Sequence, residues 1–407
     1  MRQNQNLRMI YQQSIAILFF IFFTMPILSP AVFGITLYIN FIIPFLDIHY
    51  LKYLIKLVTN LDRRRKVILY VIFVLLLVCF NQIKLIIEII AITTNVIYLF
   101  YTKKKRLFKY LYMFIYINIF IAIVQFVFLY INPEVSLALG PTNISKFIWG
   151  DYATATFTNF YTIFLIPRVS GWSREAGFFA SLLILTFACY LQDSDEKKSW
   201  WKIILYIIGF IISFSKVTLV LIPLFVITYL SKYINKIPFI IGVLGIVLFG
   251  IIFSNVFLIK KYDNPGLESY THRFSGYTVL QDLEFNELIF GVNEISQLQC
   301  REEYSFLQYI EGYKEFTGIP NLIIHTGVIV SIAYILFLSA SGISLSGFIF
   351  ITITTLTTSY FTSQSFVILG YFYVYFYQKE LGNQSFFLGT KLFFKNLLNK
   401  GSVLEEC

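Results

Sequence analysis

The stretch LFKYLYMFIYINIFIAIVQFVFLYI, residues 107–131, decides the class of fold. It carries one charged residue, near its start, and as a helix it is long enough to cross the roughly 30 Å hydrocarbon core of a bilayer. The rest of the 407-residue chain is similar, since 57% of its residues are hydrophobic, 13% are charged and its mean hydropathy is +0.73. Soluble domains carry about 25% charged residues. The sequence therefore predicts an integral membrane protein built of helices.

Apolar runs on both sides of this stretch predict an all-α, polytopic protein with about 12 transmembrane helices in a single transmembrane domain, residues 1–407. The further runs are 10–28, 31–46, 67–82, 83–101, 176–191, 201–215, 217–230, 237–258, 321–338, 345–362 and 365–377. We expect 67–101 to form a helical hairpin that turns at Asn81–Lys84. We expect the first run to be a span and not a signal peptide, because no small-residue cleavage site stands out.

Basic residues are distributed unevenly between the loops, and this bias predicts orientation. If the N-terminus is inside and the sides alternate, most of the 32 lysines and arginines fall inside, so both termini are expected to be cytoplasmic. Two long loops, about 132–175 and 259–320, then lie outside, and a tail of about 378–407 lies inside. Alternating acidic and apolar residues over 281–315 predict short amphipathic helices. Residues 391–400 predict a basic amphipathic helix on the inner leaflet.

Several classes of function lack their motifs in this sequence. The net charge of +10 suits topology-determining loops and anionic lipid head groups, so nucleic acid is not an expected partner. The chain has no GxxxxGK[ST] phosphate loop, no GxSxG elbow and no HExxH pair, and its four cysteines form no CxxC pair. We therefore expect neither a metal ion nor a cofactor. Asp193-Ser194-Asp195 is the nearest approach to a metal-binding acidic pair, and we expect it to be a solvated turn.

Charged side chains at the expected outer ends of helices are the candidate functional residues. Arg168, Arg174 and Glu175 precede one span, Lys216 lies between two apolar runs, and Arg273 lies in the second long loop. A single arginine in such a place often only extends to the lipid phosphates. Cations from three segments could instead converge on one anion, and guanidinium groups suit phosphate. Glu175 could pair with an arginine or act as a base.

Three segments resemble the bacterial superfamily of O-antigen polymerases and O-antigen ligases. RVSGWSREAGFFASLLIL (168–185) is similar to its Arg-x-x-Gly…Glu-Pro-Gly-x-x-Ala pattern, with Ala176 replacing proline. FSKVTLVLIPL (214–224) resembles a Ser-Arg step that opens a helix, with Lys216 where arginine is commoner. HRFSGYTVLQDLEFNELIFGVN (272–293) is similar to an arginine followed by an amphipathic helix and a Phe-Gly-x-Gly turn. The matching positions are Arg168, Gly171, Glu175, Gly177, Ala180, Arg273 and Gly291, and Asn293 replaces the last glycine.

A fourth segment, GIPNLIIHTGVIVSIAYIL (318–336), looks like the return helix that follows the large outer loop in this superfamily. Pro320-Asn321 stands where ligases have His-Asn, and His325 is displaced by about a turn. This departure favours a polymerase over a ligase. The segment from Arg301 to Gly312 also fits the Arg-x10-Gly pattern of polymerase outer loops.

The resemblance implies a metal-independent glycosyltransferase of lipopolysaccharide biosynthesis in the bacterial inner membrane. It would join undecaprenyl-pyrophosphate-linked O-antigen repeat units at the periplasmic face. Its catalytic candidates are Arg168, Glu175 and Arg273, and its substrate-binding candidates are Lys216, Arg301, Asn321 and His325. The implied partners are the lipid-linked oligosaccharide, membrane lipids, a chain-length regulator and a flippase. Two alternatives stay open: an O-antigen ligase acting on lipid A-core, and a flippase or other transporter of lipid-linked oligosaccharides, which would carry charges through its centre and show repeated halves.

Overall fold

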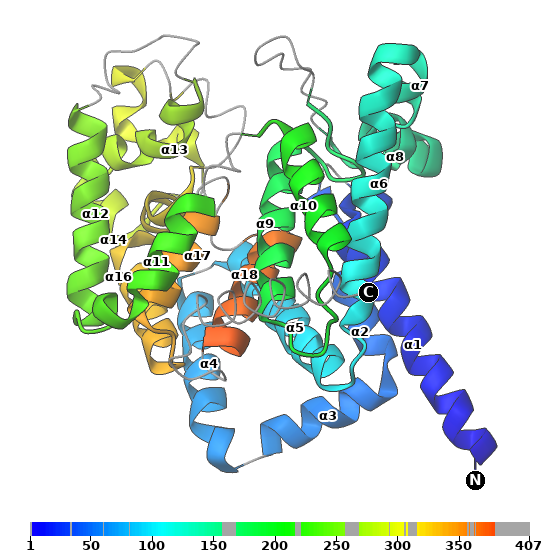
Figure 1. Cartoon of the computed structure of the whole chain (residues 1–407). Coiled ribbons are helices and arrows are strands. Elements are labelled where there is room, and N and C mark those ends of the chain that lie inside the picture. The colour runs from blue at the N-terminus through cyan, green and yellow to red at the C-terminus, as the bar shows by residue number, and fades with distance from the viewer. Residues whose placement is uncertain are drawn as a thin grey trace, which may run out of the picture. The chain divides into compact units, whose positions relative to one another are not determined.

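A computed structural model of the chain is almost entirely helical (Figure 1). It describes residues 2–32, 35–59, 61–80, 82–156, 168–215, 221–256, 268–292, 294–304, 307, 316–355, 358, 362 and 364–378. Within these residues, five helices are long and apolar enough to cross a membrane: Leu7–Thr24, Leu85–Lys104, Lys109–Ile131, Phe239–Val256 and Gly318–Ala340. Shorter apolar helices cover Val67–Cys79, Ala176–Gln192, Trp200–Ser213, Leu345–Thr354 and Ser365–Tyr377. The described residues thus fit an all-α membrane protein but not the predicted count of 12 transmembrane helices.

The chain forms two compact units, each of which is described by itself. The first consists of Met1–Lys56, Thr93–Tyr229 and Ser363–Cys407, and the second of Leu57–Ile92 and Leu230–Thr362. Three helices contribute residues to both units: α3 (Ile48–Thr59), α5 (Ile83–Lys104) and α11 (Leu221–Ile234).

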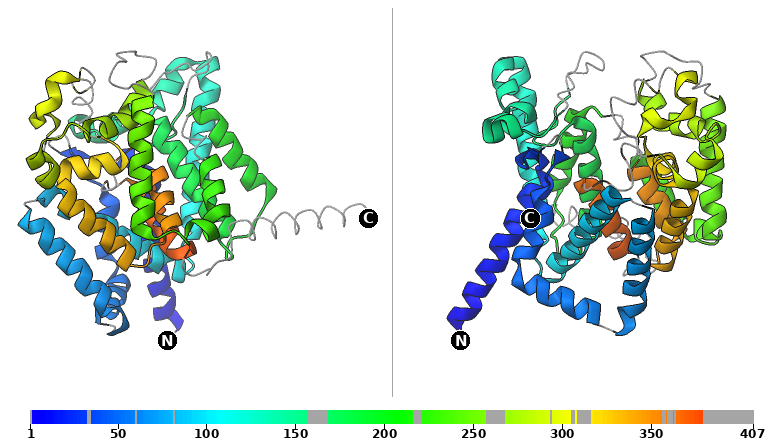
Figure 2. Two further views of the ribbon diagram at one scale, coloured as in Figure 1. Left: turned by 90° about the vertical axis from the view of Figure 1, so that its left-hand side faces the viewer. Right: turned by 180° about the vertical axis from the view of Figure 1, so that it is seen from behind.

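The first unit packs long helices around a core of aromatic side chains. Its other elements are α1 (Arg2–Thr24), η1 (Pro26–Leu28), β1 (Ala31–Val32), β2 (Ile35–Thr36), α2 (Ile39–Leu46), α6 (Lys109–Ile131), α7 (Pro133–Ala138), α8 (Pro141–Trp149), η2 (Gly150–Tyr152), α9 (Ala176–Gln192), α10 (Trp200–Ser213), α18 (Ser365–Tyr373) and the π-helix η8 (Val374–Gln378). Helices α6, α9 and α10 lie against one another (Figures 1 and 2). Phe19, Phe20 and Phe23 of α1 are fully buried, and Phe108 stacks on Phe372.

The predicted second span, residues 31–46, is wrong. This segment contains the antiparallel pair β1–β2, followed by the eight-residue helix α2 with Pro44 inside it. Pro30 immediately precedes the strand pair and lacks a backbone donor, whereas α2 continues through Pro44. The end of α2 nevertheless lies beside the first half of α1, where the Tyr11 hydroxyl donates to the Leu46 carbonyl at 2.5 Å.

The second unit is held by close contacts between helices. Its elements are α4 (Leu61–Cys79), α12 (Phe239–Val256), α13 (Glu268–Val279), α14 (Phe285–Phe290), η6 (Ile295–Gln297), η7 (Gln299–Glu303), α16 (Gly318–Ala340) and α17 (Leu345–Thr354). Gly250 of α12 packs on the Tyr277 ring of α13. Val279, Val292 and Ile324 belong to one buried apolar cluster.

Two further expectations meet the structure in this unit. The predicted break between two helices near Asn81 is confirmed, since α4 ends at Cys79 and α5 begins at Ile83, but the packing of these two helices as a hairpin stays a prediction. Short helices are also confirmed within 281–315, where α14 and η7 lie. The predicted helix at 391–400 lies outside the described residues.

Candidate functional site

The segment from Arg168 to Glu175 leads into the N-terminus of α9, and both of these charged residues are half-buried. Glu175 is the N-cap residue of α9 with an extended backbone (φ −157°, ψ 165°), and its side chain accepts no capping hydrogen bond. The carboxylate nevertheless lies at the positive end of the helix dipole, where negative charge is stabilised. The two predicted catalytic residues of the first unit therefore lie at the two ends of one short segment.

Gly171 fixes the turn within this segment. Its φ of +56° lies in the left-handed region, and a Cβ atom at this position would collide with Oδ1 of Asn118. The same Oδ1 accepts a hydrogen bond from the Trp172 backbone N–H at 2.7 Å. A side chain at Gly171 would thus displace the group that holds the next residue.

Asn118 and Gln125 clamp the segment from α6. Both amides are buried, and seven residues apart on a helix they lie on the same face. Gln125 Nε2 donates to the carbonyls of Gly171 (3.1 Å) and Leu139 (2.8 Å). Asn118 also donates to the Thr24 carbonyl at 3.2 Å. Polar groups are costly in a transmembrane helix unless they find partners, and here the partners fix the backbone between Arg168 and Glu175.

Arg174 does not extend toward lipid phosphates, as a solitary interfacial arginine would. Its Nε donates to the Ala155 carbonyl at 3.0 Å, and its Nη1 donates to the Tyr38 hydroxyl at 3.2 Å. The guanidinium therefore ties the segment to two other parts of the first unit. Its role in the structure is positional.

The end of α10 reaches the same place. The Val169 N–H approaches the Ile212 carbonyl at 3.5 Å, and the buried Ser215 follows the helix. A Cβ atom on Gly177 would lie 3.1 Å from Glu175 Oε1 and 4.0 Å from Ser215 Oγ, so the carboxylate and the hydroxyl both lie close to the first turn of α9. The carboxylate of Glu175 and the N-terminus of α9 thus lie together, at the end of the segment that begins with Arg168. Such groups could bind an anion and accept a proton.

Lys216, the next predicted cation, lies outside the described residues. The predicted residues Arg273, Arg301, Asn321 and His325 all belong to the second unit. Convergence of these residues with Arg168 on one anion therefore stays a prediction.

Arg273 and Asn321 lie near one crossing of helices in the second unit. Arg273 is half-buried in α13, and its carbonyl accepts from Thr317 Oγ1 at 3.3 Å. Gly276, one turn later, packs so closely on Pro320 that an added Cβ would lie 2.5 Å from the proline Cβ. Asn321 is buried immediately after this contact, and its Nδ2 has no hydrogen-bond partner among the described residues. The two predicted residues therefore come from adjoining parts of α13 and α16.

His325 lies where α16 breaks. Gly327 has φ +75° and ψ 165°, so the helix is interrupted there. Gly291, at the end of α14, lies against this break, and its successor Val292 donates its N–H to the Ile324 carbonyl at 2.8 Å. The His325 ring contacts the Val292 carbonyl through Nδ1 at 3.0 Å. The glycine that matches the family turn is therefore a close backbone contact, and His325 stabilises it.

Arg301 is half-buried in η7, beside the buried Cys300. Burial raises the pKa of the Cys300 thiol to about 11, so this thiol is not activated as a nucleophile. Gly312 of the Arg-x10-Gly pattern lies outside the described residues. Within the described part of the chain, no group of three His, Cys, Asp or Glu side chains is placed to hold a metal ion.

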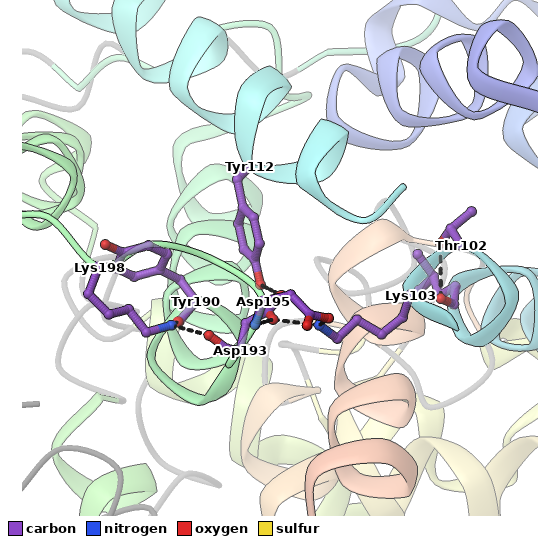
Figure 3. Close-up of polar contacts among 8 residues, drawn as sticks. Thr102, Lys103, Tyr112, Tyr190, Asp193, Asp195 and Lys198 are labelled. Carbon is purple, nitrogen blue, oxygen red and sulfur yellow. Dashed lines mark hydrogen bonds and ion pairs between the residues drawn. The ribbon is translucent and has the colours of Figure 1, made fainter. Parts of the chain in front are cut away.

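The opposite end of α9 carries a different polar cluster (Figure 3). Lys103 Nζ contacts Asp193 Oδ1 at 2.5 Å and Asp195 Oδ2 at 2.6 Å, and the Tyr112 hydroxyl donates to Asp193 Oδ2 at 3.0 Å. Only Asp195 is well exposed; Lys103 and Asp193 are 7% and 2% exposed. The expected solvated turn is therefore wrong for Asp193, because a lysine 90 residues earlier in the chain neutralises it.

Lys198 completes this second cluster by closing the end of the helix. It donates to the carbonyls of Tyr190 and Asp193, which end α9 and have no partner within the helix. Burial lowers the pKa of its ammonium group to about 8. The hydrogen bond from Lys103 lowers the pKa of Asp195 below its ordinary value.

Asn118 and Gln125 are the functional candidates that motif reasoning missed. Their signal was present in the sequence as two polar residues at i and i+7 within the apolar run 107–131. Sequence alone could not name their partners, because Gly171 and Trp172 are about 50 residues further along the chain.

Comparison with known proteins gives no further support for any function. No family model matches the chain, no curated protein matches it, and no solved structure matches it. The functional case therefore rests on the residues of the site.

Proposed function

We propose that the chain is a membrane-embedded glycosyltransferase of the O-antigen polymerase type. It would join oligosaccharide repeat units carried on undecaprenyl pyrophosphate at the periplasmic face of the bacterial inner membrane. The apolar helices support a membrane protein, and the residues around α9 support the chemistry.

The fixed segment between Arg168 and Glu175 carries this proposal. An arginine that only anchors a helix in lipid needs no support from buried amides. Here Asn118 and Gln125 hold the backbone between a guanidinium and a carboxylate, and Gly171 is the residue that allows the turn. Reactive groups are effective when their backbone is held rigidly.

Each charged group then has a role in the transfer step. A hydroxyl oxygen of the acceptor sugar attacks the anomeric carbon of the donor, and the bond from that carbon to the pyrophosphate oxygen breaks. The electron pair leaves with the pyrophosphate, whose negative charge Arg168 and the N-terminus of α9 stabilise. Glu175 accepts the proton of the attacking hydroxyl. Lys216 is a further cation proposed for the pyrophosphate, and Arg273 stays a catalytic candidate on its sequence match alone.

The proposal is tested by complementation of a strain from which the gene for this chain has been deleted. Arg168→Ala, Glu175→Gln and Arg273→Ala should insert into the membrane normally but give lipid A-core that carries a single repeat unit. Lys146→Ala, at an exposed position of α8, is the matched control and should restore long chains. Long chains from Arg168→Ala would contradict the assigned role.

The same deletion strain separates a polymerase from a ligase. Loss of a polymerase leaves one repeat unit on lipid A-core, whereas loss of a ligase leaves none. A deletion strain without any O-antigen on lipid A-core would transfer the assignment to the ligase.

The break in α16 is the one observation among the described residues that favours a transporter. Interrupted helices form substrate sites in many transporters, because their free backbone groups bind the substrate. In this chain, two carbonyls next to the break have partners, since Val292 N–H donates to Ile324 and Gln82 Nε2 donates to His325 at 3.3 Å. Transport of lipid-linked oligosaccharide across vesicles by the purified chain would favour the transporter.

A further inference from the structure

One end of the first unit combines an amphipathic helix with basic turns. The start of α3 lies beside the start of α1, where Arg8 Nη2 is 3.0 Å from His49 Nδ1. About one turn later, the Tyr53 ring contacts the Tyr101 ring of α5, and Lys104 Nζ is 5.9 Å from the Tyr53 centroid. Helix α3 therefore starts beside α1 and runs past the end of α5 (Figure 1).

The exposed face of α3 mixes apolar and basic residues. Ile48 and Ile55 are 55% and 63% exposed, and Lys52 and Lys56 are exposed beside them. Tyr50, on the opposite face, is fully buried. A helix that runs past the end of another helix and exposes isoleucine next to lysine has the pattern of an interfacial helix in a membrane.

Neighbouring turns extend this surface. Lys103 links the end of α5 to the end of α9, so the turns that follow both helices lie at the same end of the unit. The last residue of α5, Lys104, and the turn residues Lys105 and Arg106 are exposed. After the second turn, α10 begins with Trp200 and Trp201, each 54% exposed. Exposed tryptophan and basic residues are typical of the membrane interface.

The acidic residues of these turns do not balance the exposed cations. Asp193 and Asp195 pair with Lys103, and Glu196 pairs with Lys202. At the other end of the unit, by contrast, the described residues expose Glu134 and Asp151 along with Lys146, so the exposed charge there is not positive. The positive surface therefore belongs to one end only.

We propose that this surface binds the anionic phospholipid head groups of the adjoining leaflet, with α3 lying in the membrane plane. The surface, here called the basic collar, consists of Ile48, Lys52, Ile55, Lys56, Lys104–Arg106 and Trp200–Trp201. Its isoleucine and tryptophan side chains enter the acyl boundary while its cations contact phosphate. The proposal is independent of the enzymatic activity.

The test uses the full-length chain labelled at Ile55→Cys with an environment-sensitive fluorophore, after replacement of Cys79 and Cys407 by serine. The labelled protein is placed in nanodiscs of phosphatidylcholine, with or without phosphatidylglycerol. We expect phosphatidylglycerol to shift the emission to shorter wavelength and to protect the label from an aqueous quencher. Each of Lys52→Gln and Lys105→Gln should weaken the apparent affinity for phosphatidylglycerol about fivefold.

Matched controls exclude other occupants of the surface. Lys146→Gln, an exposed lysine on α8, should leave the response to phosphatidylglycerol unchanged. A label that is protected equally without phosphatidylglycerol would mean that a second copy or another part of the chain covers α3, and would overturn the proposal. A label that stays open to the quencher in both lipids would overturn it too.

Discussion

The two ends of α9 hold polar groups in opposite ways. At its C-terminal end, charged side chains neutralise one another, because Lys103 pairs with Asp193 and Asp195. At its N-terminal end, about 25 Å away along the 17-residue helix, neutral amides hold the backbone and the charged residues Arg168 and Glu175 flank the held segment. The first arrangement suits a structural connection between helices. The second suits a site at which the charged side chains interact with a bound substrate.

The largest effect is expected from the ion pair. Lys103→Met leaves a buried carboxylate without its partner, so the free energy of unfolding should fall by about 3–5 kcal/mol. The double variant Lys103→Met/Asp193→Leu removes both charges and should recover most of this loss. Denaturation of the purified protein in detergent measures both. Equal stability of Lys103→Met and the unmodified chain would show that the pair is not structural.

Arg168→Ala should have the next largest effect, on rate and not on stability. Removal of a group that stabilises charge in a transition state typically costs about 100-fold or more in rate. We therefore expect transfer of lipid-linked repeat units to fall by about that factor, with an unchanged denaturation midpoint. Arg168→Lys should recover part of the rate, since it keeps the charge but not the planar fork. A lower denaturation midpoint together with a normal transfer rate per folded molecule would show that Arg168 is a structural residue.

The clamp from α6 predicts a smaller, coupled effect. Asn118→Ala leaves the partly buried Trp172 N–H unpaired, which costs about 1 kcal/mol or more of the free energy of unfolding. Gly171→Ala places a Cβ against Asn118 Oδ1 and should slow transfer as well. Because the two changes act on the same contact, the double variant should lose less free energy of unfolding than the sum of the losses in the two single variants. Strictly additive losses would show that Gly171 and Asn118 act separately.

The smallest effect is expected from Asp195, whose side chain is 49% exposed. Exposed ion pairs contribute about 0–1 kcal/mol, so Asp195→Asn should change stability by no more than this. Because the hydrogen bond from Lys103 lowers the pKa of Asp195 in the folded chain, its contribution is complete above the ordinary value of 3.8. The contribution is lost as the pH falls through the lower, folded-state pKa. Asp195→Asn should therefore make stability fall less steeply as the pH is lowered. An unchanged pH dependence would show that other groups cause the loss of stability at low pH.

Local sequence patterns predicted the helices that take part in this comparison. The run 176–191 anticipates α9 to within a residue, and 83–101 and 107–131 anticipate α5 and α6 closely, because hydropathy is a property of the segment itself. The run 31–46 failed because a short antiparallel strand pair occupies its first part, which average hydropathy does not register.

Contacts between distant segments set the limit of sequence reasoning at the site. Arg168, Gly171 and Glu175 could be named from their motif. The roles of Asp193 and Arg174 could not, since Lys103 and Tyr38 lie far away in the chain. Buried polar groups depend on such partners, so their environment is readable only in the folded chain.

The rate of glycosyl transfer per folded molecule tests the contrast between the two ends of α9 most directly. It should be measured on unmodified protein, Arg168→Ala and Lys103→Met/Asp193→Leu in nanodiscs, with an undecaprenyl-pyrophosphate-linked repeat unit as substrate. We expect Arg168→Ala to lose about 100-fold, while the double variant at the other end keeps a rate close to that of the unmodified protein. Equal losses at both ends, or an undiminished rate for Arg168→Ala, would contradict a site at the N-terminal end of α9.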